Sequence, residues 1–432
     1  MTTYFLYVLS IFILPTLGKG LYTGVPCHLH LSCDPDHSDL LTSQTTPTEE
    51  ECQQLCRNLQ CVTYNWWTSE SPEQPDLCQL FGQECYFTGW GDPTVFLGPS
   101  RCVDPTVIIG GWGEDGYIAE VETLWPGFGH DYGRGYHNGY IVDDLFDPFP
   151  GINIYGHAAT NLNSTMIIVC GGDECHGLDL ITGSWVTLPP MNYARNYLSL
   201  VTLGNHVVAV GGANTKDLEI FDPASNSWIN IWPMPEQRSG QCTVVVDEYH
   251  IILIGDLTGA NMNLTTMLDT LTGVWTRLPD IPIGRYGGHA CIKTAVDFSL
   301  PEESREVGVM VTGGQDGHSS ANDLWPGKAV EFLSLETYTW RRLADSSYSQ
   351  WDHSMTILES HPPISGFRFD APLILGGEYE VQDDDGRPET HQRNYVQTFL
   401  GNSSDWPNEW DCCVPQLKWK RSMFSAVRVQ LD

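Results

Sequence analysis

A short apolar segment that ends in two glycines recurs along most of this chain and constrains its fold more than any other feature. The segment occurs six times from about residue 105 onward, as TVIIGG, MIIVCGG, HVVAVGG, IILIGD, GVMVTGG and PLILGG. The fourth copy keeps Gly255 and has Asp256 in place of the second glycine. Short apolar runs bounded by glycine are typical of buried β-strands, and a long-period repeat indicates stacked supersecondary units. The sequence therefore predicts a mainly β domain built from repeated small sheets.

A single tryptophan follows most of these segments, at the expected start of a later strand. These tryptophans are Trp185, Trp228, Trp275, Trp340 and Trp419. Turn-forming sequences such as FDPASNS and DTLTG precede several of them. Glycine permits the positive φ of a sharp bend, and tryptophan fills the space between neighbouring sheets. The order strand, diglycine, strand, turn and tryptophan strand resembles the kelch repeat. This resemblance covers residues 105–432 and implies a six-bladed kelch β-propeller.

The two ends of the repeat region indicate how such a ring closes. His157, Tyr197 and Gln241 each lie 14 residues before the first glycine of their repeat, which predicts that the innermost strands begin there. His289 and His353 take the same place in the next two repeats. The final segment RSMFSAVRV is a further copy of the innermost strand without a diglycine, whereas the first repeat lacks such a strand. We therefore expect the C-terminal strand to complete the first blade, which removes exposed sheet edges.

The region before residue 103 is dense in cysteine. It holds eight of the chain's 14 cysteines, namely Cys27, Cys33, Cys52, Cys56, Cys61, Cys78, Cys85 and Cys102. An even, dense cluster is typical of small extracellular domains that disulfides stabilise. The cluster contains no Cys-x-x-Cys pair, and His28, His30 and His37 lack the spacing of zinc-finger ligands. This pattern favours disulfides over a zinc site.

The middle of this cluster has the pattern of a helix followed by strands. Thr48 precedes three glutamates, which a helix favours in its first turn, and Cys52 and Cys56 would share one face of that helix. Cys61 follows, and the apolar residues of VTYNWW then alternate as in a strand. A helix with Cys-x3-Cys, a third cysteine and an aromatic strand resembles the PAN/Apple domain. The resemblance covers residues 21–102 and implies a small disulfide-rich α+β module.

The PAN/Apple resemblance also implies a disulfide pattern and a role. In that family two disulfides hold the helix to the sheet and a third joins the ends of the domain. Carried over to this sequence, the pairs would be Cys56–Cys61, Cys52–Cys78 and Cys27–Cys102, with Cys33–Cys85 as an extra pair. The alternative of Cys52–Cys85 with Cys33–Cys78 stays open. PAN/Apple modules bind proteins or carbohydrates without catalysis, so the resemblance implies recognition, with a structural spacer as the alternative.

The N-terminal segment and three glycosylation sequons indicate export. The segment is nearly all apolar from Tyr4 to Leu17, which matches a signal-peptide core and is shorter than a membrane span. We therefore expect a signal peptide over residues 1–20, with a buried first strand as the alternative. Asn-x-Ser/Thr sequons are typical of secreted glycoproteins, and they occur at Asn163, Asn263 and Asn402. The prediction is a secreted, extracellular glycoprotein without a membrane span.

The charge of the chain narrows the class of partner. Lys and Arg total 21 against 54 Asp and Glu, for a net charge of −33. Such a surface repels nucleic acid and anionic lipid and favours a basic ligand. The loops after the diglycines are acidic in five of six repeats, and aromatic residues in them offer flat contact surface. The candidate binding residues of this face are Trp112, Tyr117, Asp173, Asp256, Asp316, His318, Glu378, Tyr379, Glu380, Asp383, Asp384 and Asp385. A Ca²⁺ site at Asp383–Asp385 is the alternative for the last of these loops.

Three histidines at the expected innermost strand starts, His157, His289 and His353, are further candidate binding residues. Some secreted kelch propellers are copper-radical oxidases, and Tyr197 with Cys242 would suit the Tyr–Cys cross-link of such an enzyme. We favour the simpler interpretation that each histidine bonds the backbone of a neighbouring blade.

Sequence motifs of catalysis are missing elsewhere in the chain. It contains no Gly-x-Ser-x-Gly, His-Glu-x-x-His or P-loop motif. Arg195, Arg238, Arg285 and Arg421 precede innermost strands, as in a sialidase-like arginine cluster, but arginines at this place are common in kelch repeats. We therefore predict a non-enzymatic recognition protein with no catalytic residue, metal or cofactor.

The alternatives are a secreted propeller enzyme of the copper-radical oxidase or glycosidase type and a structural component of an extracellular matrix or cuticle. The sequence leaves open the ligand, the oligomeric state and the pairing of the propeller cysteines, which are Cys170, Cys175, Cys242, Cys291, Cys412 and Cys413.

Overall fold

The computed structural model divides into two units, Met1–Val103 and Asp104–Asp432. It describes residues 31–33, 40–45, 63–67, 77–81, 87–90, 95–99, 105–125, 140–142, 146–151, 156–213, 215–257, 259–296, 305–315, 326–359, 370–382, 388–399, 410–412 and 417–429. No helix among these residues is long and apolar enough to cross a membrane.

In the described part of the first unit, the strands form two antiparallel sheets. The larger sheet has the order β2-β4-β3-β6, and the smaller one pairs β1 with β5. Their bounds are β1 Leu31–Cys33, β2 Leu40–Thr45, β3 Thr63–Trp67, β4 Leu77–Phe81, β5 Phe87–Trp90 and β6 Val95–Pro99. Strands β3 and β4 correspond to the expected aromatic strand and to the strand expected around Cys78. The predicted signal peptide, the helix after Thr48 and the side chains of all eight N-terminal cysteines lie outside the described residues.

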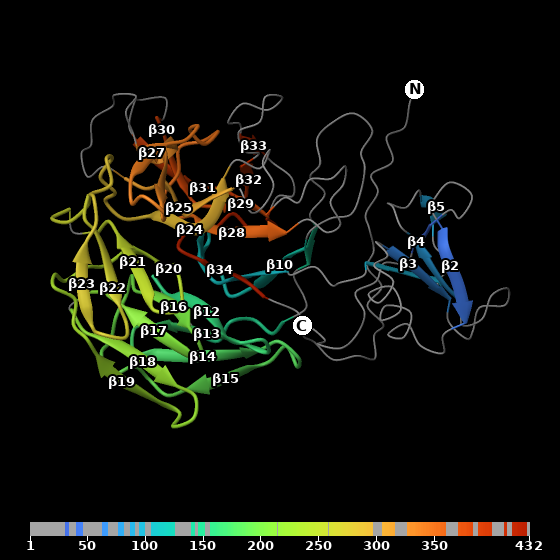
Figure 1. Cartoon of the computed structure of the whole chain (residues 1–432), viewed down its shortest axis with the longest axis horizontal. Coiled ribbons are helices and arrows are strands. Elements are labelled where there is room, and N and C mark those ends of the chain that lie inside the picture. The colour runs from blue at the N-terminus through green and yellow to red at the C-terminus, as the bar shows by residue number, and fades with distance from the viewer. Residues whose placement is uncertain are drawn as a thin grey trace. The chain divides into compact units, whose positions relative to one another are not determined.

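The second unit contains six four-stranded antiparallel sheets, here called blades 1 to 6. Blade 2 consists of β12 Ala158–Asn163, β13 Met166–Gly171, β14 Glu174–Asp179 and β15 Trp185–Leu188. Blade 3 consists of β16 Ser199–Leu203, β17 His206–Val210, β18 Leu218–Asp222 and β19 Ser227–Ile231. Blade 4 consists of β20 Cys242–Val245, β21 His250–Ile254, β22 Thr265–Asp269 and β23 Val274–Arg277. Figure 1 shows these sheets and those of the later blades arranged in a ring.

Blades 5, 6 and 1 carry the longer insertions. Blade 5 consists of β24 His289–Val296, β25 Glu306–Gly313, β26 Val330–Ser334 and β27 Trp340–Arg342, with a short 3-10 helix at Pro326–Lys328. Blade 6 consists of β28 Ser354–Glu359, β29 Asp370–Leu375, β32 Val396–Phe399 and β33 Trp410–Cys412, and inserts a hairpin of β30 Glu378–Gln382 and β31 Pro388–Gln392. Blade 1 consists of β34 Ser425–Arg428, β7 Thr106–Ile109, β10 Val121–Trp125 and β11 Tyr140–Val142, and inserts β8 Trp112–Gly113 and β9 Gly116–Tyr117.

The C-terminal strand closes the ring as the sequence predicts. Strand β34 pairs with β7, with Ala426 opposite Ile108, and so becomes the innermost strand of blade 1. Each innermost strand contacts the next one around the ring, and β34 contacts both β28 and β12. The six blades therefore form a closed propeller, which confirms the predicted six-bladed architecture of this region.

Hydrophobic cores lie between neighbouring blades from blade 2 round to blade 1. Between blades 2 and 3, for example, Ile168 packs with Val207, Phe221 and Trp228. The outer-strand tryptophan also donates its indole N–H to a carbonyl of the preceding linker, as from Trp228 to Pro189 O at 3.0 Å. The same bond recurs at Trp185, Trp275 and Trp340. The predicted role of tryptophan between sheets is therefore confirmed in these blades.

Two sequence-based assignments need correction. The outer strand of blade 6 starts at Trp410, which pairs with Phe399 as Trp228 pairs with Phe221, whereas Trp419 lies in a linker and is 37% exposed. In blade 3 the counterpart of His157 is the residue after Tyr197, because a bulge in blade 2 adds one residue to its first hairpin. Because the first hairpin differs in length between blades, counting a fixed number of residues back from the glycines does not always find the same position of the innermost strand.

Candidate binding face at the diglycine end of the propeller

The loops after the diglycines and the starts of the innermost strands lie at the same end of the propeller. Isolated backbone bridges join Trp112 to Ser422 and Glu378 to Trp351, so in each case the residue after a diglycine pairs with a linker before an innermost strand. The expectation of a shared end is confirmed. We call this surface, formed by the post-diglycine loops and the linkers before the innermost strands, the diglycine face.

A ring of left-handed residues surrounds the axis at this face. Within the two residues before each innermost strand, one residue has a φ between 51° and 65°. These residues are Gly156, Tyr197, Gly240, Gly288, Asp352 and Met423. Backbone bonds run from one to the next: Tyr197 N donates to Gly156 O at 2.8 Å, and Gly240 N donates to Tyr197 O at 2.7 Å. Asp352 N likewise donates to Gly288 O at 2.7 Å. These bonds fix the ends of neighbouring blades relative to one another.

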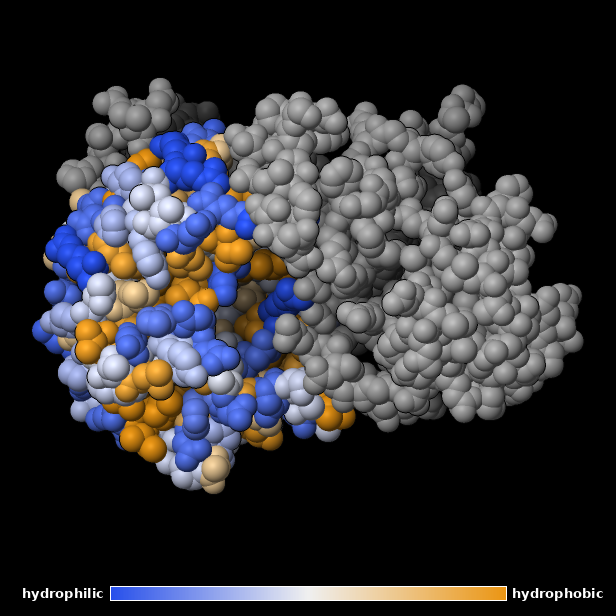
Figure 2. All heavy atoms as spheres, viewed as in Figure 1, coloured by the Kyte–Doolittle hydropathy of each residue, from blue (hydrophilic) through white to orange (hydrophobic). Residues whose placement is uncertain are grey.

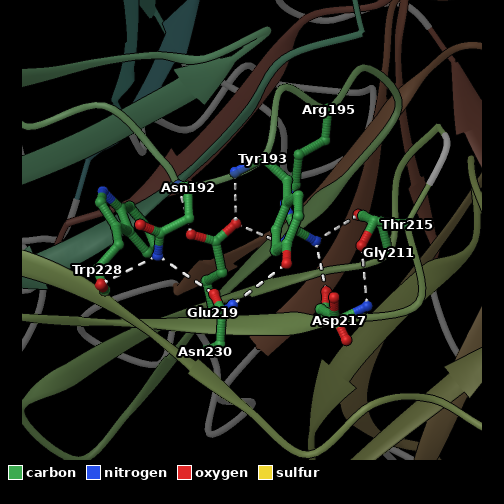
Figure 3. A network of polar contacts seen from close by, with 9 residues as sticks. All are labelled: Asn192, Tyr193, Arg195, Gly211, Thr215, Asp217, Glu219, Trp228 and Asn230. Atoms are coloured by element: carbon green, nitrogen blue, oxygen red, sulfur yellow. Dashed lines mark hydrogen bonds and ion pairs between the residues drawn. The ribbon is translucent and has the colours of Figure 1, made fainter.

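Three buried ion pairs hold the linkers beneath this face. Figure 3 shows the first, in which Arg195 donates to Glu219 Oε1 at 2.6 Å and to the carbonyls of Gly211 and Asp217. The backbone N–H groups of Asn192 and Tyr193 also donate to the Glu219 carboxylate. The corresponding pairs of blades 5 and 1 are Arg285–Glu331 at 2.7 Å and Arg421–Glu122 at 2.8 Å. These arginines are fully buried, so they are not available to a ligand carboxylate as a sialidase-like reaction requires.

Blades 4 and 6 lack the glutamate of this ion pair and have a neutral side chain in its place. In blade 4, Arg238 donates to Thr266 Oγ1 at 3.0 Å where the other blades have a glutamate, and burial lowers the pKa of Arg238 to about 10. In blade 6, Gln397 donates its side-chain amide to Gln350 at 2.8 Å. The carboxylate is therefore a feature of blades 1, 3 and 5 and not of every repeat.

The three candidate histidines are buried and bond to the preceding blade. Nε2 of His157 lies 3.1 Å from Ile109 O, Nε2 of His289 lies 2.9 Å from Ile254 O, and Nε2 of His353 lies 2.7 Å from the Thr312 hydroxyl. Burial lowers the pKa of His289 to about 4 and that of His353 to about 3. These contacts agree with the structural interpretation and contradict an exposed binding position at the mouth. Among the described residues, no group of His, Cys, Asp and Glu could hold a metal ion.

The candidate acidic residues occupy different environments. Asp173 is exposed, whereas Asp256 is 0% exposed and accepts hydrogen bonds from Ser239 N at 3.2 Å and the Asn261 amide at 3.3 Å. The prediction that Asp256 contributes to an exposed acidic face is therefore wrong, because its carboxylate replaces a glycine inside the loop. Asp316, His318, Asp383, Asp384, Asp385 and the side chain of Glu380 lie outside the described residues.

The three sequons also occupy different environments. Asn163 is exposed in the turn between β12 and β13, and its side-chain oxygen accepts bonds from both the N–H and the hydroxyl of Thr165. Asn263 is half-buried, and its side-chain nitrogen donates to Ile281 O at 2.9 Å. This nitrogen is the atom to which a glycan would attach. Asn402 lies outside the described residues.

Two inserted hairpins lie on the diglycine face, one in blade 1 and one in blade 6. Trp112 on the blade 1 hairpin is 46% exposed, while Tyr117 pairs with it and is half-buried. Ser422 joins the two hairpins, because it bridges to Trp112 and donates its hydroxyl to Glu378 at 2.7 Å. Lys420 adds an exposed ion pair with Glu114 at 2.7 Å.

An arginine lies within an aromatic cluster beside the blade 6 hairpin. The guanidinium carbon of Arg393 is 3.7 Å from the ring centre of Tyr379, 4.6 Å from that of Tyr348 and 5.6 Å from that of Tyr395. Burial lowers the pKa of Arg393, and charge interactions with the three tyrosines partly offset this. On the face of the propeller shown in Figure 2, hydrophobic residues are interspersed with hydrophilic ones.

Among the described residues, two disulfides lie within the blades. Cys170–Cys175 joins β13 to β14 around the diglycine turn, and Cys242–Cys291 joins the innermost strands of blades 4 and 5. The described cysteines include no free thiol. Because Cys242 is bonded to Cys291, it is not available for the Tyr–Cys cross-link of a copper-radical oxidase.

Sequence reasoning missed several residues of this face. Asp352, Arg393 and Ser422 lie in linkers and in an insertion, where no repeat pattern marks them. Asp352 directly precedes His353, so an alignment of the residues before each innermost strand would have revealed the single acid among them.

Comparison with known proteins supports the kelch part of the architecture. The chain is 26% identical over 223 residues to Kelch-like protein 36 of Mus musculus, covering 47% of this chain and 34% of that protein. It is 24% identical over 225 residues to Kelch repeat-containing protein kel-10 of Caenorhabditis elegans, covering 47% of this chain and 36% of that protein. The alignments therefore span about a third of the length of these relatives.

A solved structure described as "Structure of YjhT" aligns with a TM-score of 0.48 and 13% sequence identity, covering 64% of this chain and 88% of that chain. No family model matches the chain. The PAN/Apple resemblance of the first unit therefore stays a prediction.

Proposed function

We propose that this chain is a secreted, non-enzymatic recognition protein that binds a protein partner through the diglycine face of its propeller. The observation that carries the proposal is the pair of hairpins that blades 1 and 6 add to this face, with Trp112 46% exposed on one of them. An exposed tryptophan on a hydrogen-bonded hairpin is a rigid anchor that loses little entropy when a partner covers it. The similarity to kelch proteins supports protein binding as the class of function.

Two features support secretion. Disulfides form and persist in oxidising compartments, and Cys170–Cys175 and Cys242–Cys291 lie within blades and not at a reactive surface loop. The apolar N-terminal segment has the length of a signal-peptide core. In this proposal the cysteine-rich first unit is a PAN/Apple-like module that provides a second binding surface for protein or carbohydrate.

Glycosylation is part of the same proposal. The β12–β13 turn lies at the end of the blade opposite the diglycine face, so a glycan on Asn163 would leave that face open. The half-buried amide of Asn263 is already used in a hydrogen bond, so we propose that Asn163 carries the glycan and Asn263 does not.

Secretion is tested by expressing the full chain, with its own N-terminus, in a secretory cell line. The proposal predicts protein in the medium, an N-terminus that starts after the apolar segment, and a mass shift on deglycosylation that Asn163→Gln reduces and Asn263→Gln does not. Retention of the whole chain inside the cell, with reduced cysteines, would contradict it.

Binding is tested with the secreted protein as bait for extracellular proteins, followed by reconstitution with each purified candidate. Trp112→Ala should weaken a direct complex by about tenfold or more, as expected for an anchor residue. The matched control is Leu271→Ala, which removes a side chain that is 68% exposed in the β22–β23 turn at the opposite end. A complex that Leu271→Ala weakens and Trp112→Ala does not would place the binding surface elsewhere.

A further inference from the structure

Asp352 has an unusual position in the ring of left-handed residues. It is the one charged residue among the six, of which three are glycine and the others are Tyr197 and Met423. Its N–H donates to Gly288 O at 2.7 Å, and its carbonyl accepts a bond from Met423 N at 2.9 Å. The backbone of Asp352 is therefore fixed between blades 5 and 1.

The neighbouring blade leaves space for this carboxylate. A Cβ atom on Gly288 would lie 2.9 Å from Asp352 Oδ1 and 2.8 Å from Asp352 N, so any larger residue at position 288 would displace the acid. Asp352 is enclosed by its neighbours but keeps part of its surface open to solvent. A left-handed backbone is uncommon outside glycine, and Asp352 adopts it just before the innermost strand of blade 6.

Among the described residues, the groups around Asp352 provide no compensating positive charge. Glu378 is a second carboxylate, which accepts bonds from Trp351 Nε1 at 3.1 Å and from Ser422 Oγ at 2.7 Å. Burial, together with this carboxylate, raises the pKa of Asp352 to about 7. The adjacent His353 is neutral, because burial lowers its pKa to about 3.

The cations of the adjoining linker already have partners. Lys420 pairs with Glu114 and Arg421 pairs with Glu122. Within the described part of the chain, no hydrogen bond or ion pair reaches the Asp352 carboxylate. An enclosed carboxylate without a partner is unfavourable, so a cationic group that enters from solvent would gain both a charge partner and hydrogen-bond acceptors.

We propose that Asp352, with Glu378 beside it, forms a binding position for one basic side chain, lysine or arginine, of a protein partner at the mouth of the propeller axis. A side chain fits better than a metal ion, because the described residues contain no group of ligands that could hold one. The position deepens the proposed function and rests on it, since it assigns a chemical specificity to the diglycine face.

The test uses short peptides as probes and the intact secreted protein. Acetyl-Gly-Arg-Gly-amide and its lysine analogue should bind with one-to-one stoichiometry at pH 8 in calorimetry or NMR titration, and the citrulline analogue, which has no charge, should not. Affinity should fall about tenfold between pH 8 and pH 6, because a group with a pKa near 7 is about one-tenth ionised at pH 6. Asp352→Asn should abolish both the binding and its pH dependence, while Asp173→Asn, an exposed acid of the same face, should preserve them.

Three results would overturn the proposal: no binding of either basic peptide, equal binding of the citrulline peptide, or unchanged binding to Asp352→Asn. The melting temperature of each variant shows that it is folded, and asparagine tolerates the left-handed conformation. The outcome is separable from the recognition function. A purified partner whose binding depends on Trp112 but not on Asp352 would leave the recognition proposal standing and remove this one.

Discussion

Blades 3 and 6 are built from the same four-stranded repeat but use it differently. Blade 3 has short loops and a buried Arg195–Glu219 ion pair, and it has Tyr197 in the left-handed ring. Blade 6 has a neutral Gln350–Gln397 pair at the same place, an inserted hairpin, and Asp352 in the ring. The difference shows that charge can lie beneath the face, where it joins strands, or at the axis, where it can meet a ligand. Regular blades hold the ring together, and the irregular blade alters its surface.

The largest expected effect comes from converting blade 3 towards blade 6. Glu219→Gln leaves Arg195 buried without a carboxylate, and removal of one partner of a buried pair costs about 3–5 kcal/mol. Gln397→Ala in blade 6 removes one neutral bond and should cost about 1–3 kcal/mol. Chemical denaturation of the two variants measures both values. Equal losses would mean that the ion pair and the amide pair contribute alike.

The double variant Arg195→Gln with Glu219→Gln is the control for this experiment. It copies the amide pair of blade 6 and leaves no buried charge, so it should be more stable than Glu219→Gln alone. If the stability lost by the double variant equals the sum of the losses of Arg195→Gln and Glu219→Gln measured separately, the two side chains do not interact energetically.

The two disulfides provide the next comparison. Cys242–Cys291 joins neighbouring blades across 49 residues, whereas Cys170–Cys175 joins two strands of one blade across 5 residues. In the loop-entropy account, their removal by paired Cys→Ser changes should cost about 4 and about 2 kcal/mol respectively. Thermal unfolding under non-reducing conditions gives the order. A larger loss for the short bridge would show that local packing, and not chain connectivity, dominates.

The smallest expected effect is a gain in stability at Asp352. The pKa of about 7 in the folded protein lies above the ordinary value of an aspartate, so the folded state favours the protonated acid. The favourable contribution is full below pH 4 and is lost as pH rises through 7. Asp352→Asn should therefore be more stable than the wild type by about 1 kcal/mol at pH 8, and this difference should shrink at pH 5. A stability difference that stays constant between pH 5 and pH 8 would mean that the pKa of Asp352 in the folded protein lies outside this range.

The repeat pattern was sufficient to predict the six blades, the closing strand and the tryptophan contacts. These features depend on residues that recur, such as the diglycines and Trp228, and each copy supports the others. The outer strand of blade 6 was misassigned because the inserted hairpin places Trp410 34 residues after Gly376, a longer spacing than in blades 2 to 5, so that spacing alone does not distinguish Trp410 from Trp419.

The site was less predictable for a physical reason. Acidity of a loop does not reveal whether a carboxylate faces solvent, as Asp256 does not, or faces the axis. Exposure depends on contacts between blades that are distant in sequence, such as the approach of Asp352 to Gly288. The histidines could be interpreted correctly because their position at a strand start leaves a neighbouring carbonyl within reach.

Hydrogen–deuterium exchange on the full chain, with and without its purified partner, tests the central claim most directly. The account predicts slower exchange on binding in the blade 1 hairpin, the blade 6 hairpin and the linkers 348–353 and 420–424, which together form the face around Trp112 and Asp352. The turns Asp247–His250 and Asp269–Gly273, at the opposite end, should exchange at unchanged rates. Slower exchange confined to these turns or to the first unit would contradict recognition through the diglycine face.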